Sequence, residues 1–207
     1  DALVLFDGGG GEYEASITAL ERSRVVVVAG AHRALEREAQ LAITVVQGVS
    51  SADRMDLTVQ KAIELGAFAI QPVMCERSVV RLSAERAASR MEHWRRIVIA
   101  TCEQCGRNRL PEVRPVLGVS AYCARPDLLM PRLLFSPETE LRLSDAAARI
   151  GDAAVIAVGP EAGFSPVEEA MLMKAGFSQV RLGARILRTE TAAPAALAAL
   201  LALKGEF

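Results

Sequence analysis

The sequence has few aromatic residues, cysteines, histidines and lysines. Its 207 residues include one tryptophan, two histidines and four cysteines, the last at positions 75, 102, 105 and 123. That scatter excludes a small secreted domain held together by disulfides. No apolar run approaches the ~20 residues of a membrane-spanning helix, and no basic segment followed by an apolar stretch opens the chain. We therefore expect a soluble protein of the reducing cytoplasm, with no membrane partner.

The charges are close to balanced overall but unevenly distributed. The net charge is −1, yet residues 49–115 carry eight acids and eleven bases. Nearly all bases are arginines, since lysine occurs only at positions 61, 174 and 204. Arginine suits phosphate because its planar fork binds two oxygens at once. A GC-rich genome explains the same bias, so composition alone does not establish nucleic-acid binding.

Residues 1–40 are predicted to form a small β domain. Leu3 to Phe6 reads as a strand, residues 13–19 alternate between apolar and polar side chains, and an apolar run follows from residue 24 to residue 29. We expect a small antiparallel sheet or part of a barrel. The first strand starts abruptly at residue 2, so we expect earlier residues of this domain to be missing here.

Residues 41–207 change to strands alternating with helices, the pattern of a parallel α/β sheet. Strands are predicted at residues 41–46, 67–73, 133–135, 153–158 and 177–182. Helices are predicted at 51–65, from residue 83 to near 106, from 165 to 176, and at 192–203. Ser165 should cap its helix in a capping box, Thr191 or a neighbour should cap the last one, and Pro194 should lie in that helix's first turn.

Three familiar signatures carry little weight. Gly8 to Gly11 precedes a strand pattern rather than a helix, so it is interpreted as a turn. Cys102 and Cys105 have metal-ligand spacing without a second pair, and no metal site is predicted. His32 and His93 are isolated from residues that would complete a catalytic triad, so surface or core roles are favoured.

Two loops near the C-terminus are the strongest candidates for a ligand site. They are GPEAGFS at residues 159–165 and LGARILRTETA at residues 182–192, each at the end of a predicted strand. Ligands of open parallel sheets bind beyond the carboxyl ends of the strands, where glycine lets the main chain approach closely. Two ordinary turns are the alternative. That alternative accounts poorly for four polar residues, 188–191, between apolar elements.

These loops, with other stretches, make the family recognisable. The chain resembles the bacterial ribosomal RNA small-subunit methyltransferases that methylate a 16S uridine at ring nitrogen 3, a branch of the SPOUT (trefoil-knot) superfamily. The shared stretches are FDGGGGEYEASI, DRMDLTVQKAIELGAFAIQPVMCERSVV, EQCGR, VGPEAGFSPVEE and LGARILRTETA. Two residues depart from the family's pattern. Ala162 stands where a second glycine is commoner, and Cys105 stands where a small residue such as serine is expected.

The resemblance implies a fold and a cofactor. It implies a knotted α/β methyltransferase domain at residues 41–207, preceded by a partial PUA-like β-barrel for RNA docking at residues 1–40. It also implies a homodimer that binds S-adenosyl-L-methionine largely through backbone groups of three loops. The residues that it points to for the cofactor are Leu134, Phe135, Ser136, Gly159, Pro160, Glu161, Gly163, Leu182, Gly183, Ile186, Leu187, Arg188, Thr189 and Thr191.

The implied reaction also requires removal of a proton from uracil nitrogen 3, because this nitrogen is protonated and non-nucleophilic at neutral pH. A cation near the uracil oxygens would stabilise the uridinate, and a carboxylate could accept the proton. Arg188 and Glu190 are the candidates. The alternative is that Glu190 caps the last helix with Arg188 as its ion partner. The target base should leave any stack or pair to expose nitrogen 3.

The implied partner is 16S ribosomal RNA of the small ribosomal subunit. Contact with its phosphates is expected from Arg77, Arg81, Arg107 and Arg109, which lie in or beside predicted loops. Two alternatives remain: a related knotted methyltransferase acting on transfer RNA or on ribose, and a non-catalytic RNA-binding protein.

Overall fold

The computed structural model describes residues 2–127 and 129–206, which form two compact units. The small unit contains the chain up to Glu38 together with Ile99–Leu110, and the large unit contains Ala39–Val98 and the chain from Pro111 onward. The segment from 99 to 110 thus belongs with the first unit, although the division at residue 40 assigned it to the second domain. Each unit is described by itself.

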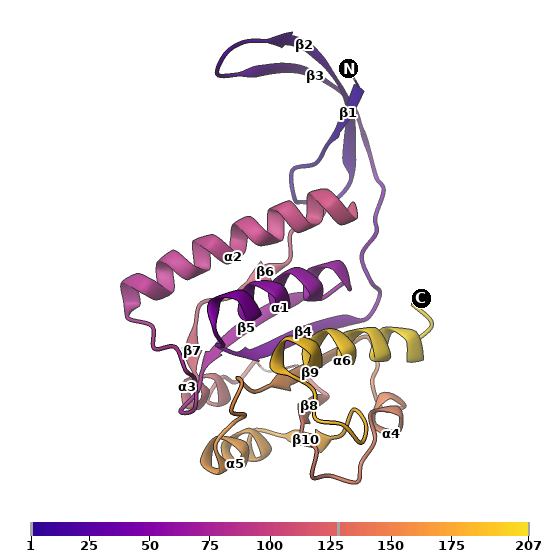
Figure 1. The fold of residues 1–207 in the computed structure, drawn as a ribbon. Coiled ribbons are helices and arrows are strands. Elements are labelled where there is room, and N and C mark those ends of the chain that lie inside the picture. The colour runs from indigo at the N-terminus through magenta and orange to yellow at the C-terminus, as the bar shows by residue number, and fades with distance from the viewer. Residues whose placement is uncertain (1, 128, 207) are drawn as a thin grey trace. The chain divides into compact units, whose positions relative to one another are not determined.

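The small unit is built on a three-stranded antiparallel sheet. Strands β1 (Ala2–Leu5), β2 (Glu12–Leu20) and β3 (Val25–Arg33) pair in the order β1-β2-β3, as Figure 1 shows. Gly10 and Gly11 between β1 and β2 have positive φ values of 106° and 72°, which fits the predicted turn. The expected antiparallel sheet is therefore confirmed.

The large unit is built on a seven-stranded sheet whose pairs are all parallel. Its strands run in the order β10-β8-β9-β4-β5-β6, with β7 paired to β5. Their bounds are β4 (Ala42–Gly48), β5 (Ala69–Met74), β6 (Glu112–Val113), β7 (Leu117–Gly118), β8 (Arg132–Phe135), β9 (Ala153–Val158) and β10 (Phe177–Val180). The α/β class with a parallel sheet is confirmed.

Helices pack around the sheet of the large unit. They are α1 (Ala52–Glu64), α3 (Val119–Cys123), α4 (Leu143–Ala147), α5 (Pro166–Lys174) and α6 (Thr189–Leu203). Helix α2 (Ala84–Cys105) is shared, since its residues up to Val98 belong to the large unit and those from Ile99 to the small unit. Helices α1 and α6 pack side by side, with α6 against β4 and β9 (Figure 1). Helices α3 and α5 share a buried cluster with strand residues such as Val46 and Ala157. Adjacent strand residues point to opposite faces, so Val45 and Ile156, also buried, face the other way.

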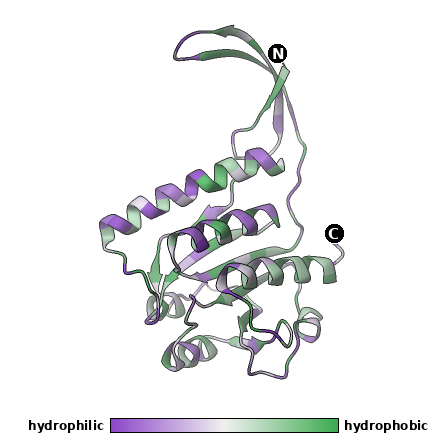
Figure 2. Ribbon diagram, viewed as in Figure 1, coloured by the Kyte–Doolittle hydropathy of each residue, from purple (hydrophilic) through white to green (hydrophobic). Residues whose placement is uncertain are grey.

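The composition of the helices matches these positions. Figure 2 shows α6 in pale and green shades along most of its length, whereas α2 carries purple, hydrophilic patches throughout. Helix α6 buries Ala193, Leu197 and Leu200 completely. None of the helices that the structure describes combines the length and the hydropathy that a membrane crossing requires.

Local signals set several helix ends as predicted. Ser165 accepts the backbone N–H of Glu168 while the Glu168 carboxylate accepts the N–H of Ser165, a complete capping box. Pro166 occupies the first helical position. Gly66 and Gly176 follow their helices with φ values of 88° and 89°, the left-handed conformation that glycine adopts without strain.

The predicted start of the last helix was wrong. Helix α6 begins at Thr189 with Arg188 at the N-cap, so Thr191 does not cap it and Pro194 lies in the helix interior. The earlier start has a physical cause, because the Thr189 hydroxyl is buried and donates to the Gly159 carbonyl at 2.7 Å. His93 has an acidic neighbour, since its Nε2 lies 2.7 Å from the Asp56 carboxylate, but Asp56 also accepts from the Trp94 indole, and this pair is not a catalytic triad.

Candidate functional site

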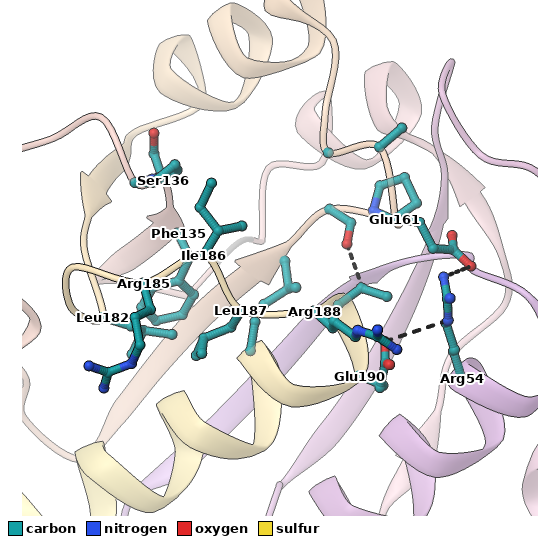
Figure 3. Close-up of a pocket in the computed structure, with 18 of the residues that line it drawn as sticks. Arg54, Phe135, Ser136, Glu161, Leu182, Arg185, Ile186, Leu187, Arg188 and Glu190 are labelled. Carbon is teal, nitrogen blue, oxygen red and sulfur yellow. Dashed lines mark hydrogen bonds and ion pairs between the residues drawn. The ribbon is translucent and has the colours of Figure 1, made fainter.

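A cavity of about 530 Å³ lies at the carboxyl ends of the strands in the large unit (Figure 3). Segments that follow β8, β9 and β10 surround it, as expected for a ligand site of an open parallel sheet. The lining residues are Arg54, Phe135, Ser136, Pro137, Val158, Gly159, Pro160, Glu161, Ala162, Gly163, Leu182, Gly183, Arg185, Ile186, Leu187, Arg188, Thr189, Glu190 and Ala192.

The loop from Gly159 to Ser165, called here the 159–165 loop, forms one wall, and its shape depends on glycine. A Cβ at Gly159 would lie 2.8 Å from the backbone nitrogen of Phe164, so this position tolerates no side chain. A Cβ at Gly48, the last residue of β4, would lie 2.5 Å from the Pro160 ring. The loop is therefore folded tightly on itself and pressed against the end of β4.

The segment from Leu182 to Arg188 forms a second wall, and its end is anchored in the core. Buried Gln47 donates to the Thr189 hydroxyl at 2.8 Å, and that hydroxyl donates to the Gly159 carbonyl. By contrast, Ile186 is 85% exposed. The segment thus combines a fixed end with an exposed apolar side chain that lines the cavity.

Three charged side chains meet at one end of the cavity, as Figure 3 shows. Arg54 of α1 lies 3.2 Å from the Glu161 carboxylate and 3.8 Å from that of Glu190. Glu161 also accepts the backbone N–H of Ser51 at 2.9 Å. Burial raises the pKa of Glu161, but the hydrogen bonds from Ser51 and the charge of Arg54 outweigh it, so the pKa lies below its ordinary value.

The two carboxylates keep unused hydrogen-bonding capacity. One oxygen of each, Glu161 Oε2 and Glu190 Oε2, is buried and accepts no hydrogen bond from the residues that the structure describes. A buried carboxylate oxygen is stabilised when it accepts a hydrogen bond. The cavity can therefore take a ligand that brings amino, ammonium or hydroxyl donors to this end.

Arg188 does not form the ion pair with Glu190 that the alternative interpretation of the sequence expected. The ion-pair partner of Glu190 is Arg54, and no ion pair of Arg188 occurs among residues 2–127 and 129–206. Arg188 is exposed at the N-cap of α6 and lines the cavity. Its guanidinium is thus available to an oxygen-rich ligand.

The cavity brings together nearly all residues that the sequence pointed to. Every predicted cofactor residue lines it except Leu134 and Thr191, and so does Glu190. Leu134 is completely buried in the core, and Thr191 is exposed on α6. Sequence reasoning missed Arg54, which reaches the site from a different part of the chain. Its only signal was its place in the DRMD stretch.

The four arginines that were expected to contact RNA phosphates are divided between the two units. Arg77 and Arg81 belong to the large unit, where both donate to backbone carbonyls. In the small unit, Arg109 pairs with Glu36 at 2.9 Å with about half of its side chain exposed. Arg107 is 5% exposed and forms an ion pair with Glu38. Because the Arg107 side chain is buried, it cannot readily reach an RNA phosphate.

Cysteine and metal-ligating chemistry adds nothing to this site. Cys102 lies near the end of α2, where burial raises the pKa of its thiol to about 11, so the thiol is protonated and a poor nucleophile at neutral pH. Within the described ranges, no group of three or more His, Cys, Asp and Glu side chains is arranged to hold a metal ion.

Comparisons with known proteins agree with this geometry. Residues 37–201 match the family model of the RNA methyltransferase domain. Two relatives, both named ribosomal RNA small subunit methyltransferase E, come from Buchnera aphidicola. The relative from subspecies Acyrthosiphon pisum is 33% identical over 82% of this chain and 67% of its own length. The relative from subspecies Schizaphis graminum is 30% identical over 97% of this chain and 81% of its own length.

A solved structure is similar over nearly the whole chain. It is the ribosomal RNA small subunit methyltransferase E of Neisseria gonorrhoeae bound to S-adenosyl methionine, with 42% identity and a TM-score of 0.88. The match covers 98% of this chain and 83% of that one. The family model and these relatives span both the strands and the loops that build the cavity. The chain therefore belongs to the RNA methyltransferase domain family.

Proposed function

We propose that this protein transfers the methyl group of S-adenosyl-L-methionine to ring nitrogen 3 of a specific uridine in 16S ribosomal RNA. The observation that carries the proposal is the cavity at the strand ends, built from GPEAGFS and LGARILRTETA. The Neisseria gonorrhoeae relative, with 42% identity, was solved with S-adenosyl methionine bound. The relatives' names supply the substrate, small-subunit ribosomal RNA.

The residues that line the cavity fit this cofactor. S-adenosylmethionine carries an ammonium group and ribose hydroxyls, and the unused oxygens of Glu161 and Glu190 can accept hydrogen bonds from such groups. Gly159, Gly163 and Gly183 leave main-chain groups open to close approach. When bound, the cofactor supplies an activated methyl group on a sulfonium centre.

Two side chains are proposed to prepare the uracil. Arg188, exposed at the cavity, stabilises the negative charge that develops on the uracil oxygens as nitrogen 3 loses its proton. Glu190 accepts that proton, and the charge of Arg54, 3.8 Å from Glu190 Oε2, helps to keep the carboxylate in place. Nitrogen 3 would then have a lone pair with which to bond the methyl carbon, while the bond from that carbon to the sulfonium sulfur breaks and its electron pair stays on sulfur as a neutral thioether. The target base leaves its stack or pair to reach this position.

The larger-scale features are proposed on the same family grounds. The chain leaves β10 at one edge of the sheet and returns in α6 to pack on β4 and β9 in its middle, a path that supports a trefoil knot. The antiparallel sheet β1-β2-β3 supports a PUA-like barrel that docks RNA. We also propose a homodimer. Arg81 and Arg109, both exposed, remain proposed phosphate contacts.

Mass mapping of ribosomal RNA tests the function. RNA from cells with and without this protein is digested and the methylated fragments are compared. Loss of one N-3-methyluridine from 16S RNA, restored by the purified protein with S-adenosylmethionine, is expected. A missing methyl group in transfer RNA or on a ribose would instead identify a related methyltransferase, and no missing methyl group with intact RNA binding would indicate a non-catalytic protein.

A further inference from the structure

The segment that follows β5 lies against the 159–165 loop. This segment, residues 75–81, is not part of the cavity wall. Two of its residues nevertheless hydrogen-bond to the loop or to the helix that follows the loop: Glu76 through its backbone N–H, and Arg77 through its guanidinium. The loop is thus supported from outside the cavity by a segment about 90 residues away in the sequence.

Glu168 is the first link between the two segments. Its side chain is 4% exposed, and its two oxygens each accept a different backbone N–H. Oε2 accepts from Ser165 and Oε1 from Glu76, both at 2.8 Å. A carboxylate has an acceptor oxygen on each side, whereas an amide in the same place would present one acceptor and one donor. The capping residue of α5 therefore also fixes the position of the segment after β5.

Arg77 is the second link. Its Nη1 donates to the Phe164 carbonyl at 3.2 Å and to the Ala162 carbonyl at 3.4 Å. Its own segment is fixed in turn by Arg81, which donates to the Cys75 carbonyl at 3.0 Å, and by Ser78, which donates to the Val49 carbonyl at 2.8 Å. Arg77 thus extends from a segment that is itself fixed by hydrogen bonds and contacts the 159–165 loop from outside the cavity.

We propose that Glu168 and Arg77 are positioning residues that hold the 159–165 loop in the shape that binds the cofactor. The inference rests on the proposed function, since it assumes that this loop binds S-adenosylmethionine. A loop held in its bound shape loses less conformational freedom on binding, so affinity rises without any direct contact. It also assigns Arg77 to the loop rather than to RNA phosphate.

Calorimetric titration of the full chain with S-adenosylmethionine tests this assignment. Glu168→Gln should weaken binding by about tenfold, because the amide cannot accept both N–H groups, and Arg77→Met by about threefold or more. Arg77→Lys should recover part of the loss, since an ammonium can still donate to one carbonyl. Turnover at saturating cofactor should stay near that of the parent protein.

The controls separate this role from its alternatives. Glu85→Gln and Arg86→Met change exposed residues at the start of α2 without a side-chain hydrogen bond or ion pair to any described residue of the loop, and both should bind S-adenosylmethionine like the parent protein. The proposal is overturned if Glu168→Gln and Arg77→Met only lower the unfolding temperature while the folded protein keeps its affinity. It is also overturned if Arg77→Met leaves cofactor affinity unchanged but lowers the salt slope of RNA binding. Failure of the parent protein itself to bind would instead reject the proposed function.

Discussion

At the scale of single residues, the site depends on how three charges are arranged. Glu161 and Glu190, with 15% and 14% of their side chains exposed, both lie within 4 Å of Arg54, which is 41% exposed. Two neighbouring carboxylates in a partly buried cavity destabilise each other unless a cation compensates them. Arg54 provides that compensation and also joins α1 to the 159–165 loop and to the first turn of α6.

Replacement of Arg54 by methionine should therefore lower stability in a pH-dependent way. The expected loss at pH 7 is about 1 kcal/mol, a modest value because the arginine is partly exposed. The pKa of Glu161 is lowered in the folded protein, so the stabilisation from its ionised form is present above its ordinary pKa of 4.5 and is lost as the pH falls. Urea unfolding at pH 7 and pH 3 should show the parent and the variant converging at low pH. A constant difference would contradict this origin.

The proposed roles of Arg188 and Glu190 are separable by kinetics. Arg188→Ala should lower turnover by ~10²-fold or more with little change in cofactor affinity, because the contact strengthens only as charge develops. Glu190→Gln should abolish the rise of rate with pH expected of the parent enzyme. Single-turnover rates with saturating cofactor and RNA measure both. Near-normal rates in both variants would reject the catalytic assignment.

At the scale of elements, the strand ends and the turns after them build the site. Each wall of the cavity begins where a parallel strand stops, and short-range signals such as the Ser165 capping box fix where the next helix starts. The loop between them stays compact because glycine allows backbone contacts that any side chain would prevent. The 159–165 loop therefore depends on glycine at its first position.

Gly159→Ala should deform this loop. The added Cβ would lie 2.8 Å from the backbone nitrogen of Phe164, which cannot yield as a flexible side chain would. We expect affinity for S-adenosylmethionine to fall by about tenfold or more, measured by calorimetry, with a stability loss of ~1–3 kcal/mol. Gly151→Ala is the matched control, because a Cβ there meets no atom within 4 Å. Equal affinities in the two variants would show that the loop shape does not govern binding.

At the scale of the whole molecule, α6 combines burial with an unusually apolar sequence. One face of the helix is packed in the core of the large unit, and near its end Leu203 remains 53% exposed. The helix is thus more apolar than its contacts within one chain require, which supports the proposed homodimer.

Light scattering should therefore give a mass twice the 22.1 kDa of one chain at micromolar concentration. The measurement is made with and without S-adenosylmethionine, since a ligand that binds only the assembled form would favour it. A dilution series distinguishes a stable dimer from concentration-dependent association. A mass of one chain under all these conditions would refute the dimer.

The sequence by itself determined the features that depend on near neighbours. Apolar alternation predicted the strand at residues 13–19, and short apolar runs predicted strands of the parallel sheet. The Ser165 capping box and Gly176 predicted the bounds of α5, and the glycine-containing loops predicted most of the cavity lining, because each signal acts within a few residues. Tertiary structure alone decided the rest. Arg54 reaches Glu161 across more than a hundred residues, and Glu168 binds Glu76 across 92. Such contacts depend on which strands become neighbours in the sheet, and local patterns carry no information about that order.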